Sequence, residues 1–295
     1  MRLSILIPTH NLAPEALIEA LRHQAEALHI DYEILVLNDA SDDAATLTAL
    51  QRMEQTGACR VIQQTARQGR AHARNILYME SSGELLLFID SDALVCSDDF
   101  IARHLQDAEK APVVCGALTN PAPPAPPDCE LRYKYETAAE KSGHRTAAYR
   151  NRHPYDRIAT FQLLLRRYVM ERAPFDESIT EYGYEDVLFG LRLEELGIPV
   201  LHTDNALLHS GINPSIHFLA NTEAAMRTLH TLPLAYKQRI GLSRFAMRLQ
   251  SMHLAAPVRL LFRATRHLIR RNLLSRRPSL TLFQFYKLGF YLLRL

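Results

Sequence analysis

Short apolar segments alternate with segments of helical periodicity along the N-terminal part of the chain, and this alternation restricts the possible folds most strongly. The apolar, β-prone runs lie at residues 3–7, 34–37, 61–62 and 85–89. Between them, apolar residues recur every three or four positions, which is typical of helices. Strands that alternate with helices form largely parallel sheets, and continuous apolar runs indicate burial on both faces. The sequence therefore predicts an α/β fold with helices on both faces of the sheet.

A proline-rich segment at Pro121–Pro127, which reads PAPPAPP, separates this region from the rest of the chain. Such a segment is stiff and extended. Beyond it we expect a strand at 159–165, a helix at 185–196 that ends at Gly197, and a strand near Val200. After about residue 220 the pattern becomes helical and basic. No internal repeat is evident.

The net charge of +2 over 295 residues conceals a strong asymmetry. All 32 acidic residues lie at or before Glu223, whereas 14 of the 34 Lys and Arg residues follow it. The formal charge is therefore −12 up to Glu223 and +14 beyond it. A basic segment of this kind is suited to a polyanionic surface, either a membrane leaflet or a nucleic acid.

Two further features bear on the cellular compartment. The N-terminus runs directly into a strand pattern without the apolar core or cleavage site of a signal peptide, so we expect a cytoplasmic protein. The four cysteines have no CxxC spacing, which argues against a structural zinc site or a disulfide framework. We expect free thiols.

Asp90-Ser91-Asp92 follows the apolar run 85–89 directly. In parallel sheets, ligands bind beyond the carboxyl ends of the strands. Carboxylates are the ligands that Mg²⁺ and Mn²⁺ prefer, usually completed by phosphate oxygens of a substrate. The alternative is a polar strand end whose aspartates cap the next turn, and the motif alone does not separate the two interpretations.

Asp39 ends the second predicted strand and could accept hydrogen bonds from a nucleobase or from ribose hydroxyls. The alternative is capping of the next helix. Ser41 or Asp42 is better placed for that N-cap, which leaves Asp39 for a ligand.

Two helix starts carry further polar groups. Gly69 precedes a helix with Arg70 and Arg74 in its first turns, where an anion or a base edge could be held. Glu185 and Asp186 open a second helix, near the positive end of its dipole, so we expect Asp186 to stay ionised. Such a carboxylate can act as a general base towards an acceptor hydroxyl. The alternative is that both acids only stabilise the helix start.

Five segments together resemble family 2 glycosyltransferases with the GT-A fold, in order and in spacing, over about residues 1–215. They are Ser4–Asn11, the Asn38-Asp39 turn, Gly69–Asn75, Asp90–Asp92 and Gly183–Asp186. Phe175-Asp176-Glu177 and Arg192 are also familiar in that family. The resemblance implies a Rossmann-like mixed sheet with helices on both faces and a basic helical C-terminal extension.

The resemblance also implies a division of the chain. We expect a catalytic domain at residues 1–220, with a nucleotide-binding half at 1–120 and an acceptor-binding half at 130–220, and a helical basic extension at 221–295.

By the same resemblance, Thr9 and Asp39 would contact the base and ribose of a uridine nucleotide, and Arg74 the base or the phosphates. Asp90 would face the ribose or the donor sugar, and Glu185 would contact donor or acceptor hydroxyls. The family's usual Asp-Asp-Gly-Ser turn is altered to Asn38, Asp39, Ala40 and Ser41 in this chain, so the role of the first carboxylate is in doubt.

For the metal and the chemistry, the resemblance implies that Asp92 binds Mn²⁺ or Mg²⁺ directly and that Asp186 is the catalytic base. His209 would complete the metal or diphosphate site, with His202 as the weaker candidate. The implied reaction is a single in-line displacement that inverts the anomeric centre, from a UDP-sugar to an acceptor hydroxyl. Polysaccharide or other cell-surface glycan synthesis is the expected setting, with a glycan or a lipid-linked molecule as the acceptor.

The C-terminal part predicts an amphipathic basic helix. One face would carry Val258, Leu261, Phe262, Leu268 and Ile269, and another Arg259, Arg263, Arg266 and Arg270. Such helices lie in the headgroup layer of anionic membranes. We therefore expect a peripheral association with the inner face of the membrane, with aromatic anchors at Phe283, Phe285, Tyr286, Phe290 and Tyr291. The alternative is a helical pair that packs on the catalytic domain.

Two other classes of protein remain open. A haloacid-dehalogenase-like phosphatase also has an Asp-x-Asp after an apolar strand, but Leu94 stands where that motif prefers Thr or Val, and the motif normally opens that fold. A nucleic-acid-binding protein could use the basic tail, but the rest of the chain is acidic and the tail has no recognisable motif. We expect no nucleic acid partner.

Overall fold

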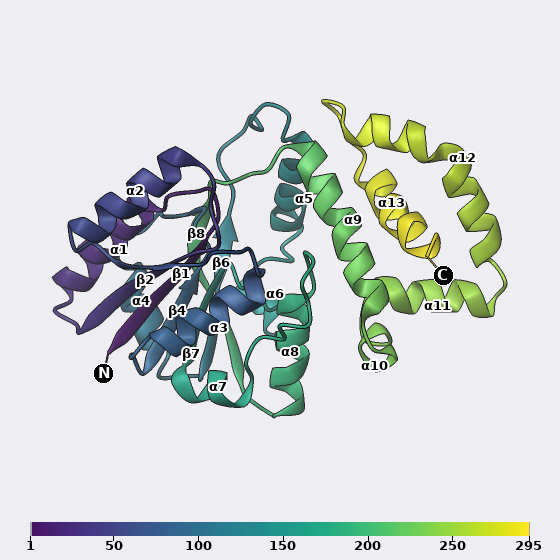
Figure 1. The fold of residues 1–295 in the computed structure, drawn as a ribbon. Coiled ribbons are helices and arrows are strands. Elements are labelled where there is room, and N and C mark those ends of the chain that lie inside the picture. Colours follow the sequence, from purple (N-terminus) through teal and green to yellow (C-terminus); the bar gives the residue numbers. More distant parts are fainter. Residues whose placement is uncertain (1, 295) are drawn as a thin grey trace. The chain divides into compact units, whose positions relative to one another are not determined.

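The computed structural model describes residues 2–294, and strands and helices alternate along much of the chain (Figure 1). The strands are β1 (Leu3–Thr9), β2 (Tyr32–Asn38), β3 (Arg60–Gln63), β4 (Leu85–Ile89), β5 (Ala93–Val95), β6 (Val113–Thr119), β7 (Gln162–Arg166) and β8 (Val200–His209). The helices are α1 (Glu15–Ala27), α2 (Ala44–Gln55), α3 (Arg70–Glu80), α4 (Phe100–Asp107), α5 (Glu130–Lys141), α6 (Ala147–Arg150), α7 (Arg167–Arg172), α8 (Glu185–Glu195), α9 (Ser215–Thr231), α10 (Leu234–Lys237), α11 (Gly241–Ser251), α12 (Ala255–Leu273) and α13 (Leu280–Leu292), with a 3-10 helix η1 (Pro154–Arg157).

All eight strands belong to one mixed sheet in the order β3-β2-β1-β4-β7-β6-β8-β5. The first four strands in this order, β3, β2, β1 and β4, run parallel to one another, as the alternation of strands and helices predicts. β7 runs antiparallel to both β4 and β6, and β5 closes the edge antiparallel to β8. The α/β fold class with a mixed sheet is therefore confirmed.

Two compact units make up the structure. The first contains the residues up to Pro121 together with Ser142–Thr180 and Glu185–Gly211. The second contains Ala122–Lys141, Glu181–Tyr184 and the residues from Ile212 onward. The sheet lies in the first unit, and α5, α9 and α10 to α13 lie in the second. The division at residue 220 and the two halves at 1–120 and 130–220 stay predictions.

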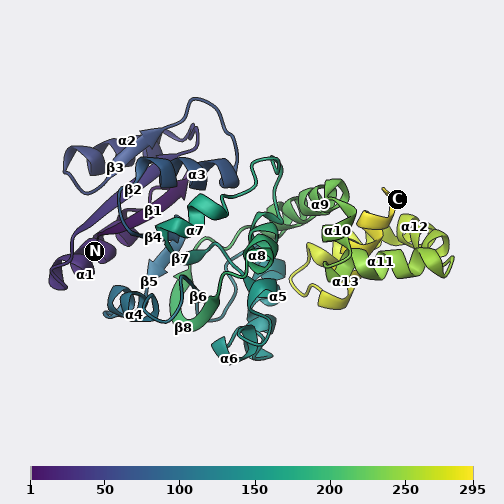
Figure 2. The same ribbon diagram turned by 90° about the horizontal axis from the view of Figure 1, so that it is seen from below.

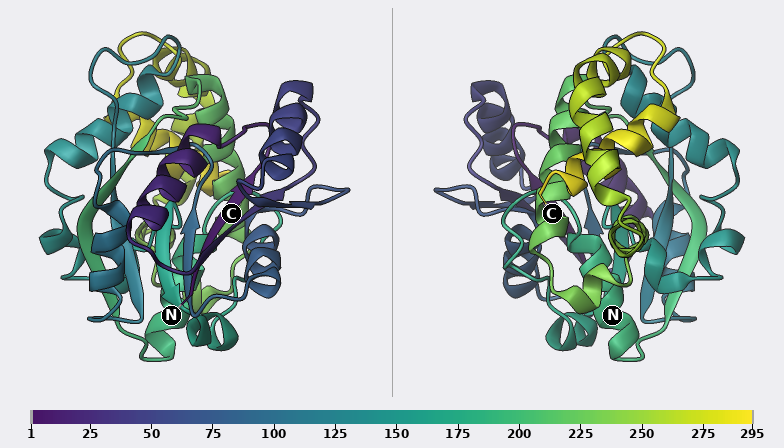
Figure 3. Two further views of the ribbon diagram at one scale, coloured as in Figure 1. Left: turned by 90° about the vertical axis from the view of Figure 1, so that its left-hand side faces the viewer. Right: turned by 90° about the vertical axis from the view of Figure 1, so that its right-hand side faces the viewer.

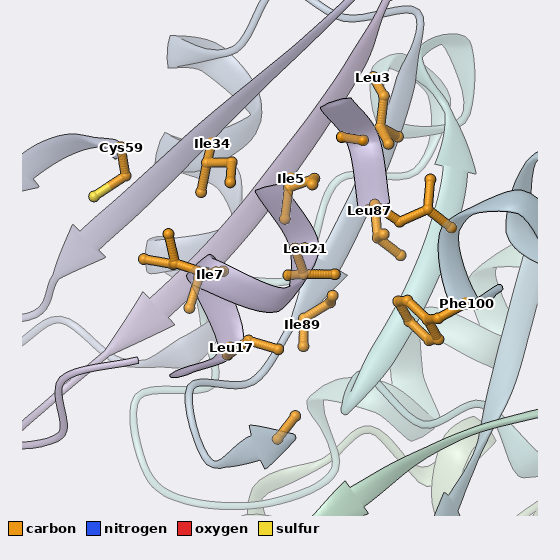
Figure 4. Packing of buried hydrophobic residues seen from close by; sticks show 14 of the residues in the cluster. Leu3, Ile5, Ile7, Leu17, Leu21, Ile34, Cys59, Leu87, Ile89 and Phe100 are labelled. Atoms are coloured by element: carbon orange, nitrogen blue, oxygen red, sulfur yellow. The ribbon is translucent and has the colours of Figure 1, made fainter. Parts of the chain in front are cut away.

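The sheet is buried on both faces because its central strands are apolar on both sides. In β1, Leu3, Ile5 and Ile7 pack into one cluster and Leu6 into the other, which follows from the twofold period of a strand. The first cluster includes residues of α1, α2 and α4 (Figure 4), and the second includes residues of α3, α7 and α8. Figure 2 shows α1 and α4 on one side of the strands and α3 and α7 on the other.

All four cysteines are free, as the sequence predicts. Cys59, Cys115 and Cys129 are buried and Cys96 is exposed. Burial raises the pKa of the Cys59 thiol to about 11 and that of the Cys115 thiol to about 12. These two side chains therefore act as apolar packing groups rather than as nucleophiles.

The aromatic side chains of α13 form the core of the second unit. Phe283, Tyr286, Phe290 and Tyr291 are at most 7% exposed. Phe283 packs on Phe218 of α9, with ring centroids 5.4 Å apart. The prediction that these four aromatic residues anchor the chain in a membrane is therefore wrong, because they are buried within the unit. Figure 3 shows the helices of the C-terminal part, in green and yellow, and α13 contacts both α9 and α12.

The apolar residues of α12 do not share one face. Phe262 and Ile269 are buried, whereas Leu261 and Leu268 are exposed. Gly289 of α13 admits the Phe262 ring, since a Cβ at this position would overlap it. The predicted single apolar face is therefore divided between a buried side and an exposed side. Neither α12 nor any other described helix has both the length and the apolar content needed to cross a membrane.

Candidate functional site

The predicted ligand-binding residues of β1, β2 and β4 lie at one edge of the sheet. These three strands are neighbours and parallel, so their carboxyl ends are adjacent. Thr9 ends β1 and pairs with Asn38 at the end of β2. The Asp39 backbone N–H donates to the Thr9 carbonyl at 2.9 Å, and Asp90 follows β4 directly. All of these residues belong to the first unit.

Asn38 has a structural role at the end of β2. Its amide donates to Gln63 Oε1 of β3 at 2.7 Å, and its Oδ1 accepts from the Ser41 N–H at 3.0 Å. An aspartate here could accept the Ser41 N–H in the same way, and it could bond to Gln63 only if the Gln63 amide turned to present its N–H. Asn38 therefore fulfils a local structural role that does not require a carboxylate.

Asp39 is buried, and one of its carboxylate oxygens accepts from the Gln68 N–H at 3.1 Å. The second oxygen bonds to none of the residues that the structure describes, which leaves it available to a ligand donor. The prediction that Ser41 or Asp42 caps α2 is wrong. Asp43 is the N-cap, and its carboxylate accepts from the Thr46 N–H at 2.7 Å.

Thr9 and Asn11 shape the turn after β1. The Thr9 hydroxyl donates to the Leu12 carbonyl, so it is already engaged by its own turn. Asn11 has a φ of 54°, and its Oδ1 accepts from the N–H groups of Asp42 (2.9 Å) and Asp43 (3.1 Å). The sequence places Asn11 in a polar cluster at the end of β1, where a ligand was expected. The structure gives it a turn-forming role, for which asparagine is suited because it tolerates left-handed backbone better than most residues.

Ala40 has a φ of 53°, where the family turn has glycine. A non-glycine residue in this region costs about 1–2 kcal/mol, whereas glycine loses about 0.5–1 kcal/mol of chain entropy. We therefore expect Ala40→Gly to raise the free energy of unfolding by about 0.5–1 kcal/mol in urea denaturation. As the matched control, Ala16→Gly in the exposed part of α1 should lower it by about 1 kcal/mol. Equal losses for both variants would contradict the strain at Ala40.

Arg74 is fully buried, and one terminal nitrogen donates to Asp90 Oδ1 at 2.7 Å. Its guanidinium carbon lies 5.6 Å from the centroid of the Phe175 ring. The other terminal nitrogen and Nε have no partner among the described residues. Arg74 and Asp90, which the sequence assigns separately to the donor, therefore form one ion pair at the end of β4.

Asp92 and His209 come together although 117 residues separate them. Asp92 Oδ2 lies 3.2 Å from His209 Nε2, and the pairing of β5 with β8 positions both residues. Gly211 lies against the carboxylate, since a Cβ there would be 2.6 Å from Asp92 Oδ2. His202, the weaker candidate, instead contacts Arg150 at 3.0 Å and the Pro154 carbonyl at 2.8 Å. Burial lowers its pKa to about 4.

The residues around Asp92 fit a divalent cation that is shared with a diphosphate. Asp92 Oδ1 is buried without a hydrogen-bond partner among the described residues, which is costly for a carboxylate unless a cation or another donor compensates it. No set of three or more His, Cys, Asp and Glu side chains within residues 2–294 is arranged to hold a metal. One carboxylate and one imidazole suffice where phosphate oxygens and water complete the shell.

Gly211→Ala tests the position of the Asp92 carboxylate. The added methyl group would displace that carboxylate from His209, because the space is already filled. We expect the Mn²⁺ concentration for half-maximal nucleotide binding to rise about tenfold, as measured by calorimetry. Gly241→Ala is the matched control, since a Cβ there meets no atom within 4 Å. An unchanged Mn²⁺ dependence in Gly211→Ala would exclude Asp92 from the metal site.

Glu185 and Asp186 open α8, as the sequence predicts. Glu185 is buried, and its Oε1 lies 3.8 Å from a terminal nitrogen of Arg70. Asp186 Oδ1 accepts from the Val187 N–H at 2.8 Å. Burial and, second, the negative charge of Glu185 raise the pKa of Asp186 to about 7. Asp186 is therefore harder to ionise than its place at a helix start predicts, because desolvation outweighs the helix dipole.

Asn75 of α3 fixes the segment that supports both Arg74 and α8. Its amide donates to the Phe175 carbonyl (2.9 Å) and to Glu177 Oε1 (2.7 Å), and its Oδ1 accepts from the Phe175 N–H (3.0 Å). The Phe175 ring stacks on Phe189 of α8 with centroids 4.5 Å apart. Sequence reasoning named this asparagine only as part of a motif.

Similarity to known proteins agrees with this geometry. The model of glycosyl transferase family 2 matches residues 4–172. The uncharacterized glycosyltransferase YfnE of Bacillus subtilis is 22% identical over 251 residues, in a match that covers 67% of this chain and 62% of YfnE. The chain therefore spans less than two thirds of the length of this relative.

Two solved structures share the fold. TarS from S. aureus has a TM-score of 0.52 at 17% identity, over 85% of this chain and 72% of TarS. The mannosyltransferase PcManGT from Pyrobaculum calidifontis has a TM-score of 0.53 at 15% identity, over 99% of this chain and 85% of PcManGT. The expectation of a GT-A fold is confirmed. Since the family model matches more than half of the sequence, on a sheet with the predicted motifs at its strand ends, the chain belongs to glycosyl transferase family 2.

Proposed function

We propose that this protein is an inverting glycosyltransferase that moves a sugar from a UDP-sugar to an acceptor hydroxyl. The proposal rests on two arginines of α3. They link the acid at the end of β4 with the acids that open α8. Arg74 bonds to Asp90, and its positive charge is also among the influences that lower the pKa of Asp186. Arg70, one turn earlier, faces Glu185 at 3.8 Å. The strand-end acids and the α8 acids thus belong to one electrostatic system.

The mechanism we propose is a single displacement. The acceptor oxygen attacks the anomeric carbon while the bond from that carbon to the diphosphate oxygen breaks, and Asp186 takes the acceptor proton. The diphosphate leaves with the bonding electron pair. Because the hydroxyl becomes acidic only as the new bond forms, a base with a pKa of about 7 is well matched to this proton.

The other predicted residues have supporting roles in this proposal. Thr9 and Asp39 contact the uridine, Arg74 and Asp90 stand near the ribose and phosphates, and Glu185 contacts sugar hydroxyls. Arg74 acts on the donor indirectly, by holding Asp90 in place, because the Arg74 side chain is fully buried. A Mn²⁺ or Mg²⁺ ion held by Asp92 and His209 would supply positive charge to the departing diphosphate.

The structural relatives support a nucleotide-sugar donor. TarS has been crystallised with UDP-GlcNAc and with UDP, and PcManGT with GDP-Man and Mn²⁺. They favour a divalent metal, and they leave a guanosine donor as the main competitor to a uridine donor. We propose synthesis of a polysaccharide or another cell-surface glycan on a glycan or lipid-linked acceptor. The setting is the cytoplasmic side of an anionic membrane, with the C-terminal helices at its surface.

The two rival classes of function have less support. A phosphatase of the haloacid dehalogenase type needs a free carboxylate to attack phosphorus, whereas Asp90 is bonded to a buried arginine. The family model that matches this chain is that of a glycosyltransferase, and it represents neither a haloacid dehalogenase nor a nucleic-acid-binding protein.

Nucleotide release from a panel of UDP- and GDP-sugars in the presence of Mn²⁺ tests the proposal. We expect UDP release from at least one UDP-sugar and its loss on chelation of the metal. GDP release alone would overturn the uridine assignment. Hydrolysis of phosphate monoesters without any nucleotide release would overturn the transferase itself.

A further inference from the structure

The outer side of α12 carries an apolar stripe that the fold of the second unit does not use. Phe262, Ile269 and Leu273 face inward and are at most 5% exposed. Leu260, Leu261 and Leu268 lie on the opposite side and are 70%, 54% and 65% exposed. At 100° per residue, the stripe also includes Pro257 and Ala264. We call these five residues the outer stripe.

Two exposed arginines accompany the outer stripe. By the same rotation of 100° per residue, Arg263 lies beside the stripe and Arg271 continues it towards the C-terminal end of α12. Arg263 and Arg271 are exposed, and the contacts found within the described part of the chain include no ion pair for either. Arg266 and Arg270, on another side of α12, are engaged: they lie 3.7 Å and 3.5 Å from Glu223. The sequence of α12 contains no Asp or Glu, so the helix itself offers no acidic side chain to neutralise the outer arginines.

The combination of exposed leucines and exposed arginines indicates which kind of partner the outer stripe binds. A second copy of the chain docked by the same stripe would bring the exposed arginines of two α12 helices together, and α12 has no acid to pair with them, which is unfavourable. A nucleic acid would match the charge but would leave the leucines in contact with phosphate and water. An anionic lipid surface satisfies both features, because leucines can enter the acyl boundary while arginines remain among the headgroups.

We propose that the outer stripe of α12 lies in the headgroup layer of an anionic membrane, with Leu260, Leu261 and Leu268 inserted and Arg263 and Arg271 on lipid phosphates. The inference rests on the proposed membrane setting and names the side chains that make the contact. It moves the lipid contact away from Phe262, Ile269 and the aromatic residues of α13. Phe262 and Ile269 are buried, and the Phe262 ring packs edge-on against Tyr286 of α13, so these side chains stabilise the unit instead.

Cosedimentation of the full chain with lipid vesicles tests the inference. The vesicles contain phosphatidylcholine either alone or mixed with phosphatidylserine. Leu260→Gln/Leu268→Gln should weaken binding to the anionic vesicles about thirtyfold, since each leucine contributes about 1–2 kcal/mol when inserted. Arg263→Gln and Arg271→Gln should each weaken it about fivefold. Met79→Gln, an apolar residue of the first unit that is 62% exposed, should leave it unchanged.

Two further measurements separate this inference from the proposed activity. Nucleotide release without lipid should be the same for all these variants, because none of the changed residues belongs to the site. Circular dichroism should show the same thermal unfolding, since the changed side chains are exposed. Failure of vesicle binding with intact nucleotide release overturns the membrane inference and the proposed membrane setting, and it leaves the proposed transfer of sugar standing.

Three outcomes would overturn it. Wild-type chain that stays in the supernatant with anionic vesicles excludes the lipid surface. Equal binding by the double leucine variant and the wild type excludes the outer stripe. A concentration-dependent dimer in sedimentation velocity, lost in the leucine variant while vesicle binding persists, would assign the stripe to a second copy of the chain.

Discussion

Asp186→Asn lowers the rate of sugar transfer by roughly three orders of magnitude while nucleotide binding is kept. The amide has the same shape as the carboxylate and can still accept the Val187 N–H, but it cannot take a proton from the acceptor. Steady-state kinetics gives the turnover number, and calorimetry with UDP and Mn²⁺ gives the nucleotide affinity. The wild-type value of kcat/KM should fall as the pH is lowered through about 7, because Asp186 is then protonated.

Glu195→Gln is the matched control for this prediction. Glu195 lies at the other end of α8, where it is exposed and paired with Arg192 at 3.2 Å. Its removal should change turnover by less than about twofold and free energy of unfolding by less than about 0.5 kcal/mol. Near-normal turnover in Asp186→Asn would show that another group accepts the proton.

The same substitution should stabilise the fold in a pH-dependent way. In the unfolded chain Asp186 ionises near its ordinary pKa, whereas in the folded protein it holds its proton up to a pH of about 7. Its contribution therefore favours folding at low pH and is lost as the pH rises through 7. At pH 8 we expect Asp186→Asn to be more stable than wild type by on the order of 1 kcal/mol. Thermal unfolding should show that this gain shrinks towards pH 4.

Asp92→Asn is expected to have the second largest effect. The amide keeps the hydrogen-bonding distance to His209 but removes the charge that would hold a cation beside the diphosphate. Mn²⁺ affinity in the presence of UDP should fall by more than the roughly 100-fold typical of losing only a partner of a metal ligand. Electron paramagnetic resonance of free Mn²⁺ measures this directly, without any turnover.

Asp98→Asn controls for the general loss of a negative charge near this loop. Asp98 is exposed and lies six residues beyond Asp92 in the sequence, outside the predicted site. Its substitution should leave Mn²⁺ affinity unchanged. If Asp92→Asn bound Mn²⁺ as tightly as the wild type does, the metal would have to be held elsewhere.

The parallel half of the sheet could be predicted from the sequence, because each of its strands is a short apolar run that is recognisable without knowledge of its partner strands. Leu85–Ile89 is apolar throughout, and the structure places β4 at the same residues. β5 has only three residues, and Gly116 interrupts the apolar run of β6, where the strand register is also irregular. Their positions depend on pairing with the distant strands β7 and β8, which no short window of sequence contains.

The sequence predicts the residue types of the site, but it does not predict the distances between them or their pKa values. Asp92 and His209 were each recognised, but their separation of 3.2 Å follows from the pairing of β5 with β8. The raised pKa of Asp186 depends on burial beside Glu185, which only the folded chain determines. Likewise, Phe262 and Leu261 are adjacent and equally apolar, and only the packing on Gly289 decides that the first is buried.

The anomeric configuration of the product tests the account most directly. Proton nuclear magnetic resonance, recorded while the protein transfers sugar from an α-linked UDP-sugar, distinguishes the two anomers by their coupling constants. A single displacement with Asp186 as the base predicts that the first product formed is the β-anomer. An α-linked product, with retained configuration, would require a different mechanism and would contradict the role assigned to Asp186.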